Sequence, residues 1–188
     1  MIPRAVLILC EGMTEKIYFD AVIRNKRIAR VLPVEVLEKQ GQHKALIKKC
    51  VEKRKNYASD LGIDEKEIEV WAVCDEDGLK IGYQKLLSFA NKYKVKLAFS
   101  DPQFETYLVQ HFEYVRIASK RKQLEADLSG YIGATYDKVN LDWFDEMIDR
   151  EPARLRQAIL NSERLDNHAR LPFLTVQKLT ARLLELAK

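Results

Sequence analysis

Residues 5–12 read AVLILCEG, and this stretch decides the fold. Six consecutive apolar residues without polar alternation predict a strand that is buried on both faces, as in a parallel sheet covered by helices. Glu11 and Gly12 end the strand, and Thr14 is a candidate cap for a helix over about residues 15–29. We therefore expect a β-α unit with an acidic residue at the carboxyl end of a buried strand.

The same alternation continues along the chain. Further strands are predicted at residues 34–37, 68–74 and 95–99, and further helices at residues 45–57 and 83–93. Alternation with short loops predicts a Rossmann-like parallel sheet of four strands flanked by helices, with right-handed crossovers. The functional residues of such a sheet lie at the carboxyl ends of its strands.

The pattern becomes helical beyond residue 113. Helices are predicted at residues 120–128, at 143–161 with a break at Pro152, and at 175–186. We expect an α/β core over residues 1–113 and a helical extension over residues 114–188, packed together as one compact unit. The apolar face of the last helix is expected in the core rather than in a subunit interface: Leu179, Leu183 and Leu186.

Composition sets few limits on function. The 188 residues are 47% hydrophobic and carry a net charge of +4, which permits a polyanionic partner without requiring one. The three cysteines lack CxxC spacing, so we expect neither disulfides nor structural zinc. The first apolar run is too short for a signal peptide and no stretch reaches transmembrane length, so a cytoplasmic protein without membrane contact is expected. The oligomeric state stays open.

Acidic residues follow three of the predicted strands. Glu11 follows the first strand, Asp75 and Asp77 follow the third, and Glu105 lies one helical turn after the fourth. Each acid alone has an ordinary explanation, as a solvated turn or as a first-turn residue that favours the helix dipole. Together they would repel each other unless a cation neutralises them, and carboxylates without a nearby histidine or cysteine pair favour Mg²⁺ or Mn²⁺. Glu15, four residues after Glu11, is a candidate ligand for a second ion.

Other chemistries lack their motifs. The sequence contains neither GxxxxGK[ST] nor GxGxxG, which argues against an intrinsic P-loop ATPase and a dinucleotide-binding site. No serine or cysteine stands at a nucleophile elbow, and the three histidines are scattered. His111, beside Phe112 at a helix end, is expected to be a packed structural residue. The basic run Lys120-Arg121-Lys122 is a candidate nucleic-acid contact, or simply a solvated helix face.

Several motifs resemble those of RloB-like proteins, a TOPRIM family related to OLD-family nucleases. LCEGMTEKIYF (residues 9–19) is similar to the family's opening motif, and Asp75-Glu76-Asp77 is similar to its DxD. SDPQFE (residues 100–105) followed by His111-Phe112 resembles its S-x-P-x-F-E and HF signature. Tyr136-Asp137-Lys138 resembles a Y-x-K element, and residues 172–175 resemble an N-P-x-x-T element in which Leu171 replaces the asparagine.

The resemblance implies a TOPRIM core that binds Mg²⁺ and acts on phosphodiesters of DNA or RNA, tRNA included, in prokaryotic defence against phage or foreign DNA. It also implies a separately encoded AAA-type or SMC-like ATPase as partner. Glu11 would then be a metal ligand or general acid/base, with Asp75 and Asp77 holding metal. By the same resemblance Glu15 and Glu105 become candidate residues of a second ion site, and Lys138 would steady the scissile phosphate.

Three other functions compete with nuclease activity. A primase-type nucleotidyl transferase would use a similar metal site. Strand passage would need a tyrosine nucleophile on another module, for which 188 residues leave little room. A non-catalytic nucleic-acid-binding or regulatory subunit of an ATPase complex would use the acids for a structural ion.

Overall fold

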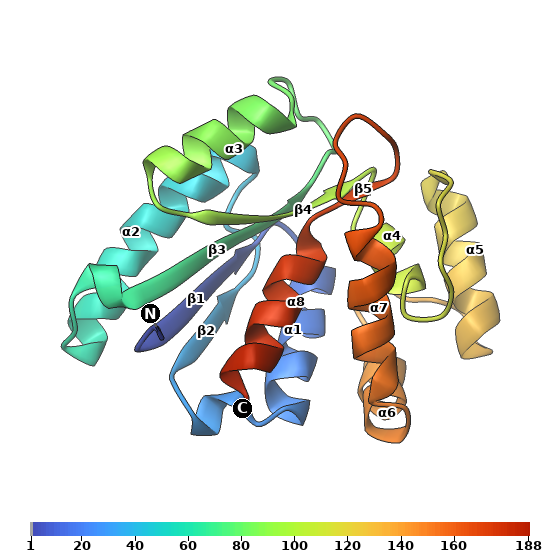
Figure 1. Cartoon of the computed structure of the whole chain (residues 1–188), viewed down its shortest axis with the longest axis horizontal. Helices are drawn as coiled ribbons and strands as arrows, with labels where there is room; N and C mark the ends of the chain where they lie inside the picture. Colours follow the sequence, from blue (N-terminus) through green and yellow to red (C-terminus); the bar gives the residue numbers. More distant parts are fainter. Residues whose placement is uncertain (1) are drawn as a thin grey trace.

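A five-stranded sheet with helices on both faces forms the centre of the protein (Figure 1). The computed structural model describes residues 2–188. The strands are β1 Ala5–Cys10, β2 Val34–Leu37, β3 Ile68–Asp75, β4 Lys96–Asp101 and β5 Phe173–Leu174. The α-helices are α1 Met13–Asn25, α2 His43–Leu61, α3 Tyr83–Lys92, α4 Glu105–Val109, α5 Arg121–Ile132, α6 Asp142–Arg150, α7 Ala153–Glu163 and α8 Val176–Leu186, with short 3-10 helices at Ile28–Arg30 and Glu65–Glu67.

The sheet has the strand order β2-β1-β3-β4-β5, and its first four strands are parallel. This confirms the predicted parallel α/β architecture, which is compatible with a Rossmann-like fold. All six residues of β1 are buried, because the strand lies between two neighbours and is covered on both faces. The short strand β5 was not predicted; it pairs antiparallel with the end of β4 through only two residues.

Side chains alternate between two hydrophobic layers. Leu7 and Leu9 of β1 join a cluster on the side of α2 and α3, whereas Val6 and Ile8 join a larger cluster on the side of α1 and α8. Figure 1 shows the corresponding layers, with α2 and α3 above the sheet and α1 and α8 below it. The carboxyl ends of the parallel strands meet at one edge, where the loop before α1 and helix α4 begin.

The segment after residue 113 contributes to the sheet as well as to a helical flank. Helix α8 packs on β4 and on α1, and its predicted apolar face is buried, as expected: Leu179, Leu183 and Leu186. The predicted break at Pro152 separates α6 from α7. No helix within residues 2–188 has both the length and the hydrophobicity needed to span a bilayer.

Two local expectations are corrected by the structure. Gly12, not Thr14, is the cap position of α1, and Thr14 lies inside the helix with its hydroxyl donating to the carbonyl oxygen of Lys138 at 2.9 Å. The fourth strand runs to Asp101, two residues beyond its predicted end at residue 99, and α4 starts at Glu105. All three cysteines are buried and free: Cys10, Cys50 and Cys74.

Candidate functional site

A cavity of about 320 Å³ opens at the carboxyl ends of the strands. Its wall contains five carboxylates, and four of them are predicted site residues: Glu11, Glu15, Asp75 and Glu105. Parallel strands bring their ends to the same edge, so residues 94 positions apart in the chain line one space. The structure thus brings together four of the five predicted metal-binding acids.

Glu11 and Glu15 enter the cavity from the turn between β1 and α1. The Glu11 amide donates to the carbonyl oxygen of Val73 at 3.0 Å, which continues the β1–β3 ladder past the end of the strand. Glu15 lies in the first turn of α1 and is only 6% exposed. A Cβ atom on Gly12 would lie 2.7 Å from Oε2 of Glu15, so only glycine lets this carboxylate fold back over the turn.

Asp75 ends β3, and a local turn places Asp77 elsewhere. The Asp77 amide donates to Oδ1 of Asp75 at 3.1 Å, and a ring nitrogen of His43 lies 3.0 Å from the Asp75 carbonyl oxygen. The Asp77 side chain is 73% exposed and is not part of the cavity wall; its carboxylate lies 4.0 Å from the Arg121 guanidinium instead. Asp77 therefore occupies the rim.

Glu105 on α4, together with the loop around residue 138 of the extension, closes the site. The Tyr136 hydroxyl donates to Oε1 of Glu105 at 3.1 Å, and the Thr14 hydroxyl bonds to the backbone of Lys138. Tyr136 was not among the predicted site residues. The Tyr136–Lys138 motif was the available signal, because alternate residues of an extended segment can face the same side.

The carboxylates shift each other's proton affinity. Burial raises the pKa of Glu11 to about 7, and the neighbouring charge of Asp75 adds to the rise. Burial also raises the pKa of Glu15 to about 7, with further contributions from Asp75 and Glu105. The pKa of Asp75 rises to about 6, chiefly through burial and then through the charge of Asp77. A concentration of negative charge in a half-closed space is costly without a cation.

Cationic side chains border the same cavity. Lys39, Arg121 and Lys138 line it, and the Arg121 Nε donates to Oε1 of Gln103 at 2.9 Å, which orients its guanidinium. The wall holds five carboxylates, Glu125 included, against three cations, so its formal charge is −2. Lys120 and Lys122 are exposed and, like Asp77, are absent from the part of the wall formed by residues 2–188.

The donor set suits a divalent cation. Every candidate ligand is a carboxylate, the class of donor that Mg²⁺ and Mn²⁺ prefer, and Oε2 of Glu11 is a buried oxygen without a hydrogen-bond partner in residues 2–188. As the side chains stand, no three acidic, histidine or cysteine residues of the described chain form a ready-made metal site. Binding would require the glutamates to turn inward, which rotamer changes permit.

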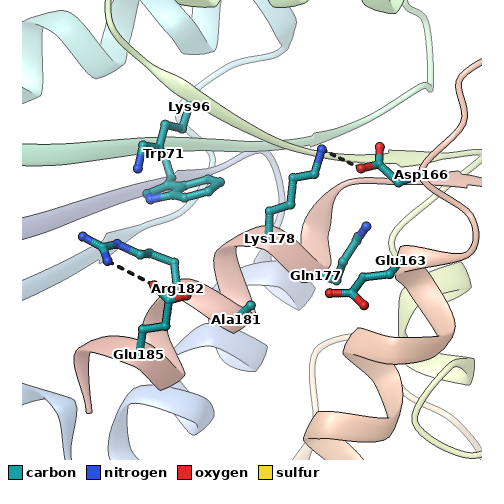
Figure 2. Close-up of a pocket in the computed structure, with 9 residues that line it drawn as sticks. All are labelled: Trp71, Lys96, Glu163, Asp166, Gln177, Lys178, Ala181, Arg182 and Glu185. Carbon is teal, nitrogen blue, oxygen red and sulfur yellow. Dashed lines mark hydrogen bonds and ion pairs between the residues drawn. The ribbon is translucent and has the colours of Figure 1, made fainter. Parts of the chain in front are cut away.

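A larger cavity, of about 410 Å³, lies elsewhere, between α8 and the strands β3 and β4 (Figure 2). Most of its charged side chains are already paired, including Lys178 with Asp166 at 2.7 Å and Arg182 with Glu185 at 3.1 Å. The pairs are visible as dashed lines in Figure 2. Cavity volume alone therefore does not identify the functional site. The carboxylates that converge in the smaller cavity, without cationic partners among residues 2–188, identify it instead.

His111 is a structural residue, as predicted. Its ring is 1% exposed, lies 3.1 Å from the Tyr18 hydroxyl and contacts the Leu108 carbonyl oxygen. Burial lowers its pKa to about 4, which keeps the ring neutral in the core.

The fold and the cavity define an α/β protein with a mostly parallel sheet and a carboxylate cluster at the carboxyl ends of its strands. Within this class, the chain belongs to the RloB-like protein family, whose sequence model matches residues 6–183. This agrees with the resemblance noted in the motifs. Neither the curated proteins nor the solved structures contain a significant match.

Proposed function

We propose that this protein is a nuclease of the TOPRIM type that hydrolyses phosphodiester bonds with the help of Mg²⁺ or Mn²⁺. The observation that carries the proposal is the convergence of Glu11, Glu15, Asp75 and Glu105 in one cavity whose rim holds cations. An anionic wall attracts a divalent cation, and a cationic rim attracts a phosphate. The combination favours phosphodiester chemistry over a site for either ion alone.

The four carboxylates would hold the cation, which when bound supplies Lewis acidity that offsets charge on the non-bridging phosphate oxygens. Arg121 and Lys138 would position the phosphate from the rim, contacts that carry no base information. Glu11 would accept the proton of the attacking water at Oε2, the buried oxygen that lacks a protein partner in residues 2–188. The water oxygen then bonds to phosphorus as the ester bond breaks, and the leaving oxygen takes a proton from solvent.

The biological setting of the proposal rests on the family resemblance. It includes action in prokaryotic defence and a separately encoded AAA-type or SMC-like ATPase as partner. In this view the nuclease carries the cutting chemistry and the partner carries nucleotide hydrolysis.

The test is cleavage of plasmid DNA and of total tRNA by purified protein with Mg²⁺, Mn²⁺ or EDTA. We expect metal-dependent cutting that Asp75→Asn lowers by at least about 100-fold, because this variant keeps the shape of the side chain and removes its charge. Asp60→Asn, at an exposed position on α2, is the matched control and should cut like the wild type.

Equal cutting by Asp75→Asn and the wild type would refute the assignment of this site. Absence of cutting in every lane, repeated with a co-purified ATPase, would leave a binding or regulatory subunit as the better explanation. Incorporation of labelled nucleotides would indicate a nucleotidyl transferase.

A further inference from the structure

A second cavity, of about 370 Å³, lies on the α3 side of the sheet. Its lining combines aromatic rings with two unpaired carboxylates: Glu76, Tyr83, Phe99, Asp101, His168 and Phe173. Pockets of this volume, with an apolar wall and a few polar groups, are typical of sites for small planar molecules. None of the predicted site residues lines it.

The two cavities are neighbours because successive side chains at the ends of β3 and β4 point to opposite faces of the sheet. Asp75 lines the carboxylate cavity, whereas Glu76, the next residue, lines the aromatic cavity. At the end of β4, Asp101 faces the same side as Phe99 and lines the aromatic cavity. One turn and the end of one strand therefore separate the two spaces.

Aromatic surfaces at two depths line the second cavity. Phe99 and Phe173 are 1% and 3% exposed and form its floor. Tyr83 packs edge-on against Phe173 with ring centroids 4.6 Å apart, and the ring of His168 lies 6.2 Å from that of Tyr83 with its plane inclined by 31°. Tyr83 is partly exposed and His168 is exposed, so both present ring surface to a ligand. Stacking on such rings is the usual way in which proteins hold unpaired bases.

Asp101 adds a hydrogen-bond acceptor to this aromatic wall. Its half-buried carboxylate has no hydrogen-bond or ion-pair partner in residues 2–188, and its pKa is raised by burial and then by the charge of another carboxylate, Glu76. A carboxylate in this position would repel a phosphate, but it would accept a hydrogen bond from an exocyclic amino group of a base. The cavity therefore suits the base of a nucleotide rather than its phosphate.

We propose that the aromatic cavity binds an unstacked, amino-bearing nucleobase of the same strand that is cut in the carboxylate cavity. This inference rests on the proposed nuclease function and makes the substrate a single-stranded or locally unpaired nucleic acid. A paired duplex cannot insert a base without first unstacking it, and that step costs a few kcal/mol.

The test measures binding apart from cleavage, with fluorescently labelled oligonucleotides, EDTA and fluorescence anisotropy. The wild type should bind an oligo(dC) or oligo(rC) single strand more tightly than a fully abasic strand of equal length or a duplex. His168→Ala should weaken binding of the base-containing strand by about 10-fold, the range expected for one lost stacking contact, and leave the abasic strand unchanged. Tyr131→Ala, an exposed aromatic residue on α5, is the matched control and should change neither.

Asp101→Asn tests how the base is read. Cytosine and thymine stack similarly but only cytosine carries an amino group, so the wild type should prefer oligo(dC) to oligo(dT). The Asp101→Asn variant should show a smaller ratio between the affinities for oligo(dC) and oligo(dT). Thermal unfolding of each variant verifies that it is folded.

Equal affinity for base-containing and abasic strands, or wild-type binding by His168→Ala, would overturn the proposal. So would the absence of measurable single-strand binding. This test is separable from the test of the nuclease function. Base-dependent binding without cleavage under any metal condition would support the base site and refute the nuclease function. Cleavage without base-dependent binding would support the nuclease function and refute the base site.

Discussion

A Glu15→Gln substitution removes a carboxylate that the fold holds at 6% exposure beside Asp75 and Glu105. The pKa of Glu15 in the folded protein is about 7, above its ordinary value of 4.5. A group with a raised pKa contributes stability that is fully present below the unfolded pKa and is lost as the pH rises through the folded pKa. From about pH 5 to about pH 8.5, proton linkage makes that loss roughly 2–3 kcal/mol in the wild type.

Glutamine does not titrate, so Glu15→Gln should escape this loss. The free energy of unfolding of the variant, relative to wild type, should therefore increase by roughly 2–3 kcal/mol over the same pH range. Contributions from distant titrating groups, such as His111, are common to both proteins and cancel. Removing the charge of Glu15 also weakens its repulsion with Glu11 and Asp75, which changes the gap in the same direction. The comparison of two pH values also removes the constant effect of packing an amide in place of a carboxylate.

Urea unfolding in EDTA, followed by circular dichroism at several pH values, measures this difference. Glu163→Gln, at an exposed position, is the control and should show no pH-dependent gap. With Mg²⁺ present the gap should shrink, because an ion bound only by the folded wild type stabilises it. A gap that is constant with pH, or that closes as the pH rises in EDTA, would refute the reasoning that this cluster is held together against electrostatic repulsion.

The remaining predictions concern the support of the site and the core. Gly12→Ala should lower cleavage by about 10- to 100-fold with a nearly unchanged melting temperature, since the added Cβ displaces the flexible end of Glu15; full activity would contradict the close approach. Tyr136→Phe should lower the free energy of unfolding by about 1–2 kcal/mol in urea, because Glu105 loses a buried donor; unchanged stability would show that water replaces the hydroxyl. The neutral core His111 contributes stability that is lost as the pH falls from 6.5 towards 4, so His111→Gln should flatten that part of the stability curve in urea titrations; an equal slope in both proteins would exclude this role.

The strands were predictable because their signal is local. Residues 5–10 and 34–37 were predicted with the bounds that the structure has. The first of these strands is buried at every position, and continuous burial shows as an unbroken apolar run. The start of α1 was missed by two residues, because the hydroxyl of Thr14 bonds to Lys138, 124 positions away. Strand β5 has only two residues, too few for any periodicity, and pairing with β4 alone defines it.

The sequence predicted which acidic residues belong to the carboxylate cluster at the strand ends, but it did not predict how they are arranged. Position after a strand was enough to select Glu11 and Asp75, because parallel strands end at one edge. Alternation also suggested Asp77, yet its amide bonds to Asp75 and leaves its side chain at the rim. The donor to Glu105, Tyr136, comes from the extension, and no local pattern links the two.

Residue types and their spacing thus determined the parallel sheet, the helix order and the acidic chemistry of its edge, because strand and helix periods and side-chain protonation are local properties. Tertiary packing decided which acids share a cavity, which cations border it, and that Glu76 and Asp101 open into a separate aromatic space. The reason is physical: burial and charge coupling depend on distances between segments far apart in the chain, and only the packed sheet sets those distances.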